Sequence, residues 1–369
     1  MSINWAQRKV EGKSFIERFT RKRFIHDGSD GSVYQWENKT TGELVAVKDS
    51  KPSRAHKNSN EIIRYLNVPA HENIIGFLGY LGVRDWTPAG PALIFEYCEY
   101  GDAYEYRHYM VRQEARVPEI SIWKFMRDVS LGLDWIHNHC EHSYVLGDLK
   151  PENVLVFPEQ DWDKQAPPLL PTFKICDFGR MEISDTVNKF NGTVEFGPPM
   201  AERNMVQTCK ADVFSLGSTI QWLAFGVFPQ MSNEEFIEYA KDKHARLITL
   251  SELRDNRREQ WRVFIPPKYR PLNASMEEQR EIWGLKYPQP PFSNLLNGWY
   301  KKLCEEDPAI RIGSDVLAEF FVPVADLEIE RLKAARSLAA ATGENQEAET
   351  IIVDEEDDVL TRGLGGIAL

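Results

Sequence analysis

The most informative part of this sequence is Gly147-Asp148-Leu149-Lys150-Pro151-Glu152-Asn153, followed downstream by Asp177-Phe178-Gly179. The two stretches supply carboxylate, amide and ammonium side chains. Phosphoryl transfer needs a carboxylate that orients the attacking hydroxyl, oxygen ligands that hold magnesium on the phosphates, and a cation that balances the developing charge. Each stretch alone would be a weak signal, but together they predict a site for phosphoryl transfer.

A glycine-rich turn and a lysine-bearing strand lie upstream. Gly28-Ser29-Asp30-Gly31 precedes Leu44-Val45-Ala46-Val47-Lys48, which is rich in β-branched residues. A turn without Cβ atoms lets backbone N–H groups approach phosphate oxygens. The same turn is also typical of an ordinary β-hairpin. Lys48, one strand later, favours the phosphate-binding interpretation.

These stretches resemble the eukaryotic protein kinase family, serine/threonine type, over residues 20–322. The resemblance implies an α+β, bilobal fold. A small β-rich N-lobe is expected at 20–97 and a larger, mostly helical C-lobe at 98–322. The expected substrate is a protein, and the expected cofactors are ATP and Mg²⁺.

Other segments are expected to extend or interrupt this pattern. They are an N-terminal extension at 1–19, insertions near 157–171 and 230–290, a helix at 323–342 and an acidic, disordered tail at 343–369. The prolines of the first insertion forbid regular strand pairing, so it is predicted to be a surface loop.

The resemblance assigns roles to single residues. Asp148 matches the catalytic aspartate and Lys150 the lysine on the γ-phosphate, while Asn153 and Asp177 match the magnesium ligands. Lys48 matches the lysine that grips the α- and β-phosphates, with Glu61 as its carboxylate partner. The expected nucleotide-binding residues are Gly28, Gly31, Val33, Ala46, Lys48, Glu96, Cys98 and Asp102, with Phe95 behind the adenine.

Several of these residues also have an ordinary interpretation. Glu61 can be a solvated charge on a helix, and Val33 and Ala46 can be core residues. Asp102 is equally suited to reach the ribose or to cap a helix N-terminus. Cys176, just before Asp177, is expected to pack and not to face the nucleotide.

The sequence departs from the family pattern around the glycine turn and the catalytic aspartate. His26 replaces the first glycine of the turn, and Asp30 replaces its aromatic tip, which is mildly unfavourable near a triphosphate. Leu146-Gly147 replaces the His-Arg pair before Asp148. The missing arginine normally pairs with a phosphorylated activation loop, so we expect activity that does not depend on phosphorylation there.

A further departure lies at the end of the activation segment. Met200 sits where the family has a glutamate, whose usual partner is a buried arginine matched by Arg311. An unpaired buried guanidinium would cost several kcal/mol, so Glu202 is a candidate replacement. Nearby, Thr193 is expected to pack against the catalytic aspartate and lysine, which together with Lys150 favours serine/threonine specificity.

Two helices are predicted in the C-lobe. Apolar residues between Ile122 and Ile136 recur at helical spacing, which predicts an amphipathic helix leading to the catalytic loop. Asp212 resembles the start of a buried central helix, where the family's aspartate braces the backbone of that loop. The stretch that follows it is apolar on nearly every side, as expected of a core helix.

The composition and net charge of the chain limit the classes of function that it can have. The chain has 369 residues, 42% hydrophobic content and a net charge of −12, which argues against direct nucleic-acid binding. The sequence contains no apolar run long enough for a bilayer and no secretory signal at its start, so no membrane association is expected.

Its five cysteines have no metal-ligand spacing, and reduced thiols in the cytoplasm or nucleus are expected. Arg254, Arg257, Arg258 and Arg262 are interleaved with acidic residues and predict a solvated helix face.

The two C-terminal segments have different characters. Asp326 to Ala341 predicts a helix with an apolar side formed by Leu327, Ile329, Leu332 and Leu338. In the tail, Ile351, Ile352 and Val353 precede an acidic run. This pattern resembles the motif that binds small ubiquitin-like modifiers by adding a strand to their sheet. A tail that only increases solubility is the favoured alternative.

Two classes of function fit the whole sequence. The first is an active ATP- and magnesium-dependent protein serine/threonine kinase, favoured by the complete set of catalytic side chains. The second is a pseudokinase that acts as a nucleotide- or protein-binding scaffold, favoured by the altered loops. Phosphorylation of a small molecule is a weaker third possibility, because the segment around Thr193 is suited to present a polypeptide.

Overall fold

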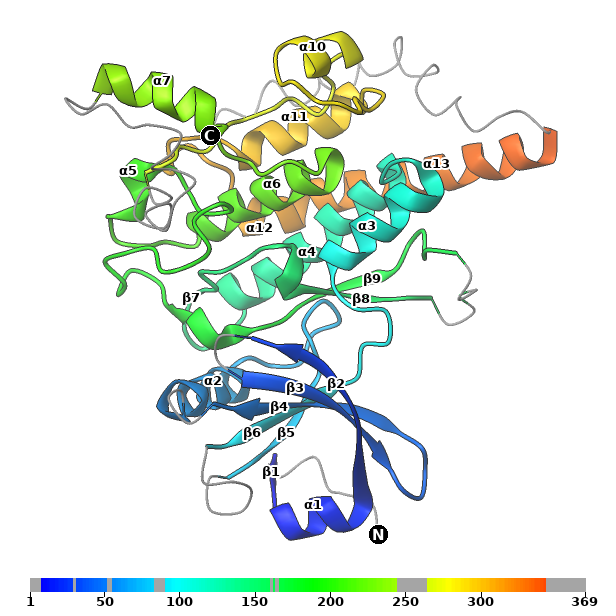
Figure 1. Ribbon diagram of the computed structural model, residues 1–369, viewed down its shortest axis with the longest axis vertical. Coiled ribbons are helices and arrows are strands. Elements are labelled where there is room, and N and C mark those ends of the chain that lie inside the picture. Colours follow the sequence, from blue (N-terminus) through cyan, green and yellow to red (C-terminus); the bar gives the residue numbers. More distant parts are fainter. Residues whose placement is uncertain are drawn as a thin grey trace.

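The computed structural model describes residues 8–28, 31–51, 55–82, 90–159, 162, 166–243 and 264–342. Figure 1 shows a small lobe built on a β-sheet and a larger, mostly helical lobe. This arrangement confirms the bilobal α+β fold expected from the sequence. The predictions for Asp30, for the arginines between 254 and 262 and for the tail motif at 351–353 lie outside the described residues.

One six-stranded sheet forms the frame of the small lobe, with strand order β1-β5-β6-β4-β3-β2. Its strands are β1 (Lys9–Val10), β2 (Phe19–Asp27), β3 (Gly31–Asn38), β4 (Leu44–Ser50), β5 (Phe77–Leu81) and β6 (Ala92–Glu96), and its helices are α1 (Gly12–Arg18) and α2 (Ala55–Asn67). In β4, Val45 and Val47 are fully buried in the small-lobe core. Because side chains alternate along a strand, Ala46 and Lys48 point to the opposite face.

The small lobe begins earlier than the sequence suggested. The segment expected as an extension at 1–19 contributes β1, which pairs in parallel with β5, and α1. Phe15 of α1 is fully buried and stacks on Phe19 with ring centroids 4.7 Å apart. Residues 9–19 are therefore an integral part of this lobe, because their aromatic side chains complete its core.

The larger lobe is organised around two buried helices. Its elements are α3 (Ala103–Glu114), α4 (Glu119–Asn138), β7 (Tyr144–Val145), η3 (Pro151–Asn153), β8 (Val154–Phe157), β9 (Thr172–Ile175), η4 (Phe178–Arg180), β10 (Glu182–Ile183), α5 (Met200–Arg203), α6 (Lys210–Phe225), α7 (Asn233–Lys243), α10 (Met276–Glu281), α11 (Asn294–Leu303), α12 (Ser314–Val316), η5 (Leu317–Phe321) and α13 (Val322–Thr342). Helix α4 confirms the amphipathic helix predicted over 122–136, and α6 is buried over nearly its whole length.

The hairpin β8–β9 carries the predicted proline-rich insertion. Val154 to Phe157 pairs with Thr172 to Ile175 in antiparallel register, so the insertion connects two regular strands. Its C-terminal end is attached to the lobe, because the Tyr106 hydroxyl donates to the Pro168 carbonyl at 3.1 Å and Ser121 Oγ donates to the Leu169 carbonyl at 2.7 Å.

The C-terminal helix α13 packs along α4, and its buried face differs from the predicted one. Ile329 and Leu332 are buried as expected, whereas Leu327 and Leu338 are 72% and 66% exposed. The helix starts at Val322, directly after the π-helical turn η5, so Val322, Ala325, Ile329 and Leu332 share the inner face. The prediction that Leu327 and Leu338 lie on the apolar side of this helix was therefore wrong. Across the described ranges, no helix is both long and apolar enough to span a membrane.

Candidate functional site

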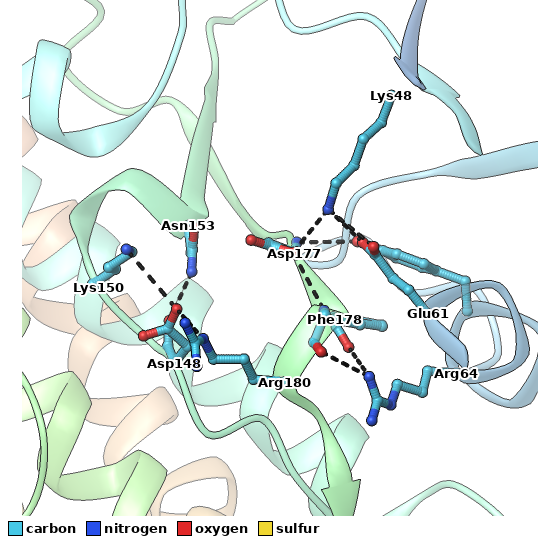
Figure 2. A network of polar contacts seen from close by, with 11 residues as sticks. Lys48, Glu61, Arg64, Asp148, Lys150, Asn153, Asp177, Phe178 and Arg180 are labelled. Atoms are coloured by element: carbon cyan, nitrogen blue, oxygen red, sulfur yellow. Dashed lines mark hydrogen bonds and ion pairs between the residues drawn. The ribbon is translucent and has the colours of Figure 1, made fainter. Parts of the chain in front are cut away.

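An ion-pair network joins the two lobes (Figure 2). Lys48 Nζ on β4 lies 2.9 and 3.0 Å from the carboxylate oxygens of Glu61 on α2, and 3.1 Å from Asp177 Oδ1. Glu61 is 1% exposed, so it is not a solvated helix charge. Burial alone would lower the pKa of Lys48, but the carboxylates of Glu61 and Asp177 outweigh it and raise that pKa. The ammonium is therefore retained at neutral pH.

Asp177 is held ionised in a fixed position. Burial would raise its pKa, but Lys48 and a hydrogen bond from the Gly179 amide lower it. The backbone N–H of Asp177 donates to the Tyr65 hydroxyl at 3.0 Å. The Tyr65 ring stacks on fully buried Phe178 at a centroid distance of 4.3 Å. This aromatic stack attaches α2 to the Asp-Phe-Gly turn and sets the direction of the Asp177 carboxylate.

The catalytic loop places Asp148 beside Lys150 and Thr193. Asp148 Oδ1 accepts a hydrogen bond from the Thr193 N–H at 2.6 Å, and Lys150 Nζ donates to Thr193 Oγ1 at 3.1 Å. Lys150 Nζ also lies 3.9 Å from Asp148 Oδ2. These contacts confirm that Thr193 packs against both residues. One carboxylate and one ammonium thus face Thr193 at the end of the activation segment.

Asn153 and Asp177 form a donor set that suits magnesium. Asn153 Nδ2 donates to the Asp148 carbonyl at 2.8 Å, which leaves its Oδ1 for a ligand. Figure 2 shows Asn153 and Asp177 extending from neighbouring elements into the same region. Magnesium prefers hard oxygen ligands and is usually held by one or two protein groups plus phosphates and water. The residues present fit that requirement.

Of the two glycines that flank the turn, Gly31 has no room for a side chain. A Cβ on Gly31 would lie 2.4 Å from the Asp49 carbonyl oxygen, whereas a Cβ on Gly28 would meet nothing closer than 3.5 Å. Lys51 Nζ donates to the Gly28 carbonyl at 2.7 Å and pairs with Asp27 at 3.0 Å. The turn is therefore tethered to the end of β4. The role of Lys51 was not visible in the sequence.

The predicted adenine-binding residues lie on facing strands. Ala46 of β4 is directly opposite Phe95 of β6, so their side chains share a face. Ala46 and Val33 are half-buried, as a surface open to a ligand requires, and Phe95 is 8% exposed. The Glu96 carboxylate bonds the Gly76 amide and Lys174, and the Cys98 thiol points to the Gly101 and Val156 carbonyls. Their backbone hydrogen bonds to adenine stay a prediction.

Asp102 caps helix α3, since its side chain accepts a hydrogen bond from the Glu105 N–H at 2.9 Å. Burial raises the pKa of Asp102 to about 6. A role at the ribose stays a prediction. Cys176 packs against the core as expected, and burial raises the pKa of its thiol well above the usual value.

The aspartate brace predicted at the central helix is present. Asp212 accepts hydrogen bonds from the Leu146 and Gly147 amides at 2.6 and 2.8 Å. Fully buried His137 of α4 lies 3.0 Å from Asp212 through Nε2, and 2.9 Å from Ser314 through Nδ1. The catalytic loop has lost its own histidine, and a histidine from another helix contacts the brace. Sequence reasoning missed His137, since nothing in its local pattern marks it.

The missing partner of Arg311 is Glu202. The guanidinium bonds both carboxylate oxygens at 2.8 and 3.2 Å, and both residues are at least 95% buried. The replacement hypothesis is confirmed. The pair attaches α5, at the end of the activation segment, to the segment that precedes α12.

Two arginines near the Asp-Phe-Gly turn were also missed. Arg64 of α2 donates to the Phe178 and Gly179 carbonyls at 3.2 and 2.8 Å, and pairs with Glu182 at 2.6 Å. Arg180 Nε lies 3.3 Å from Asp148 Oδ2. The only sequence signal for either arginine is the missing arginine at position 147, because a cation that is absent from one element can be supplied by another.

Comparison with known proteins gives a consistent result. The family model described as "Protein kinase domain" matches residues 19–320. The chain is 27% identical over 227 residues to "Serine/threonine-protein kinase RUNKEL" of Arabidopsis thaliana, covering 60% of the chain and 15% of that protein. It is 30% identical over 217 residues to "Mitogen-activated protein kinase kinase kinase 13-A" of Xenopus laevis, covering 58% and 20%.

A third relative is "Inhibitor of nuclear factor kappa-B kinase subunit beta" of Mus musculus, at 26% identity over 245 residues, which covers 63% of the chain and 30% of that protein. The chain thus spans less than two thirds of the length of these relatives.

Proposed function

This chain belongs to the protein kinase domain family, and from that premise we propose that it transfers the γ-phosphate of ATP to serine or threonine hydroxyls of proteins. The observation that carries the proposal is the convergence of Lys48, Glu61 and Asp177 with Asp148 and Lys150 between the lobes. A scaffold that transfers no phosphate has little use for this set. The relative from Arabidopsis thaliana that is named a serine/threonine-protein kinase supports the same reaction class.

Each side chain of the site has a role that follows from its position. Lys48, kept charged by Glu61 and Asp177, binds the α- and β-phosphates. Asp148 accepts the hydrogen bond of the incoming hydroxyl and orients it, while Lys150 beside it offsets negative charge on the transferred group. Asn153 and Asp177 would hold magnesium, which neutralises phosphate charge when bound. Thr193 contacts both Asp148 and Lys150 and so holds the end of the activation segment beside the catalytic loop.

The test is transfer of labelled phosphate from ATP with magnesium, to the protein itself and to a generic protein substrate. The intact chain should transfer phosphate, and Asp177→Asn should lose it. Asp185→Asn is the matched control, because it makes the same change at an exposed aspartate outside the site. If the intact chain and the control bind nucleotide but transfer nothing, the proposal fails and the scaffold alternative gains support.

We also propose that activity does not depend on activation-segment phosphorylation. One reason is that glycine at position 147 provides no cation to pair with a phosphorylated activation segment. A second is that backbone hydrogen bonds, which need no phosphate, hold this segment. Phe190 N–H donates to the Arg203 carbonyl at 2.8 Å, and Gln207 N–H donates to the Val187 carbonyl at 2.7 Å. Ser184→Ala combined with Thr186→Ala should keep kcat. Thr193 is left intact in this test because its hydroxyl contacts Lys150. Loss of turnover in the folded double variant would refute independence.

A further inference from the structure

Arg180, the residue directly after Asp177-Phe178-Gly179, contacts the catalytic aspartate. Its Nε lies 3.3 Å from Asp148 Oδ2, and another nitrogen of the same guanidinium donates to the Asn191 carbonyl on the activation segment. Figure 2 shows the Arg180 side chain running from the end of η4 to Asp148. One guanidinium thus joins the turn, the catalytic loop and the activation segment.

The two carboxylate oxygens of Asp148 have different partners. Oδ1 accepts the Thr193 N–H at 2.6 Å, while Oδ2 faces Arg180 at 3.3 Å and Lys150 at 3.9 Å. Asp148 is 7% exposed, so few water molecules can replace a lost donor. Arg180 therefore restricts rotation of the carboxylate from the side opposite Thr193.

The position before Asp148 is poorly suited to carry a long side chain. Gly147 has φ +77°, a conformation that L-residues rarely adopt, and a Cβ there would lie 3.3 Å from the Arg180 carbonyl oxygen. A cation that links the catalytic loop to the activation segment must therefore come from another element. Arginine suits this task because its fork has separate donors for a carboxylate and a carbonyl, whereas lysine has a single point charge.

We propose that Arg180 is a positioning residue that takes the place of the arginine absent at 147. It orients Asp148 and holds the activation segment against the catalytic loop through Asn191, without any phosphate. The effect on catalysis rests on the proposed kinase function, but the effect on the activation segment does not. An ion pair at an exposed surface would have little effect, whereas this one acts on a buried carboxylate that receives the substrate hydroxyl.

The experiment compares the intact chain with Arg180→Gln, Arg180→Lys and Lys189→Gln. Lys189 is an exposed cation on the same segment, so its replacement removes the same charge without the same contacts. Arg180→Gln should lower kcat about 10- to 100-fold, as expected for a misplaced catalytic group, with an unchanged KM for ATP. Arg180→Lys should keep an intermediate kcat, and Lys189→Gln should match the intact chain.

Chemical rescue separates a placed charge from a general structural effect. Millimolar methylguanidinium should restore part of kcat in Arg180→Ala and leave Lys189→Gln unchanged. A kcat of Arg180→Gln equal to that of the intact chain, an equal loss in Lys189→Gln, or no rescue of Arg180→Ala would overturn the role at Asp148.

Amide hydrogen exchange gives a readout that needs no activity. The Thr193 amide and its neighbours should exchange faster in Arg180→Gln than in the intact chain, and at the intact rate in Lys189→Gln. Unchanged exchange in Arg180→Gln would overturn the proposed hold on the activation segment. If exchange changes as expected while even the intact chain transfers no phosphate, the kinase function fails and the contact through Arg180 stands.

Discussion

Replacement of Glu202 by glutamine tests the buried ion pair that departs most from the family pattern. In the intact chain, Arg311 is 1% exposed and bonds both oxygens of Glu202. Glu202→Gln keeps the shape of the side chain but removes its charge and turns an amide N–H₂ toward guanidinium donors. The guanidinium would then be buried without a counter-charge.

The size of the effect follows from the other partners of Arg311. Removing one member of a buried pair costs about 3–5 kcal/mol. Arg311 also donates to the carbonyls of Glu305, Lys210 and Glu306, at 2.7, 2.7 and 3.2 Å. These acceptors stay in place, so we expect a loss near the lower end, about 3 kcal/mol in the free energy of unfolding.

Denaturant unfolding followed by tryptophan fluorescence measures this loss, and a double-mutant cycle with Arg311→Met isolates the pair. The expected coupling energy is about 2 kcal/mol, within the range for contacting residues. Glu330→Gln is the matched control, because Glu330 pairs with Lys333 at 3.0 Å on the exposed side of α13, and its change should fall within experimental error. A coupling energy below about 0.5 kcal/mol would refute the reasoning, since distant, independent sites add to within that value.

Two more predictions concern the nucleotide side of the site. Because burial raises the pKa of Asp102 from 3.8 to about 6, the folded protein holds a proton there that the unfolded chain releases, so stability falls as pH rises between these values. Asp102→Asn keeps the cap of α3 and should remove about 2 kcal/mol of this decrease, measured as unfolding free energies at pH 4.5 and 7.5; equal pH dependence in both proteins would contradict the assignment. Gly31→Ala should destabilise the small lobe by about 2 kcal/mol, because its Cβ would lie 2.4 Å from the Asp49 carbonyl oxygen, whereas Gly28→Ala should be tolerated. Equal thermal midpoints for these two variants would show that the turn relaxes.

Local stretches of sequence were sufficient to predict the family and to propose its reacting groups. Asp148, Lys150 and Asn153 lie within six residues of one another, and Asp177 stands in its own short motif, so their order along the chain already indicates phosphoryl transfer. Glu202 as the partner of Arg311 was also accessible, because a missing glutamate beside a retained arginine leaves a charge that burial cannot tolerate.

Only the tertiary structure determined which residues from distant elements complete the site. Arg180, Arg64 and His137 carry no local signature, and their roles depend on distances to groups that the chain brings near only on folding. The same holds for the inner face of α13, where the π-helical turn before Val322 sets the phase that leaves Leu327 in solvent. A sequence pattern records which chemistry is available, but side-chain reach and helix phase depend on packing between elements far apart in the chain.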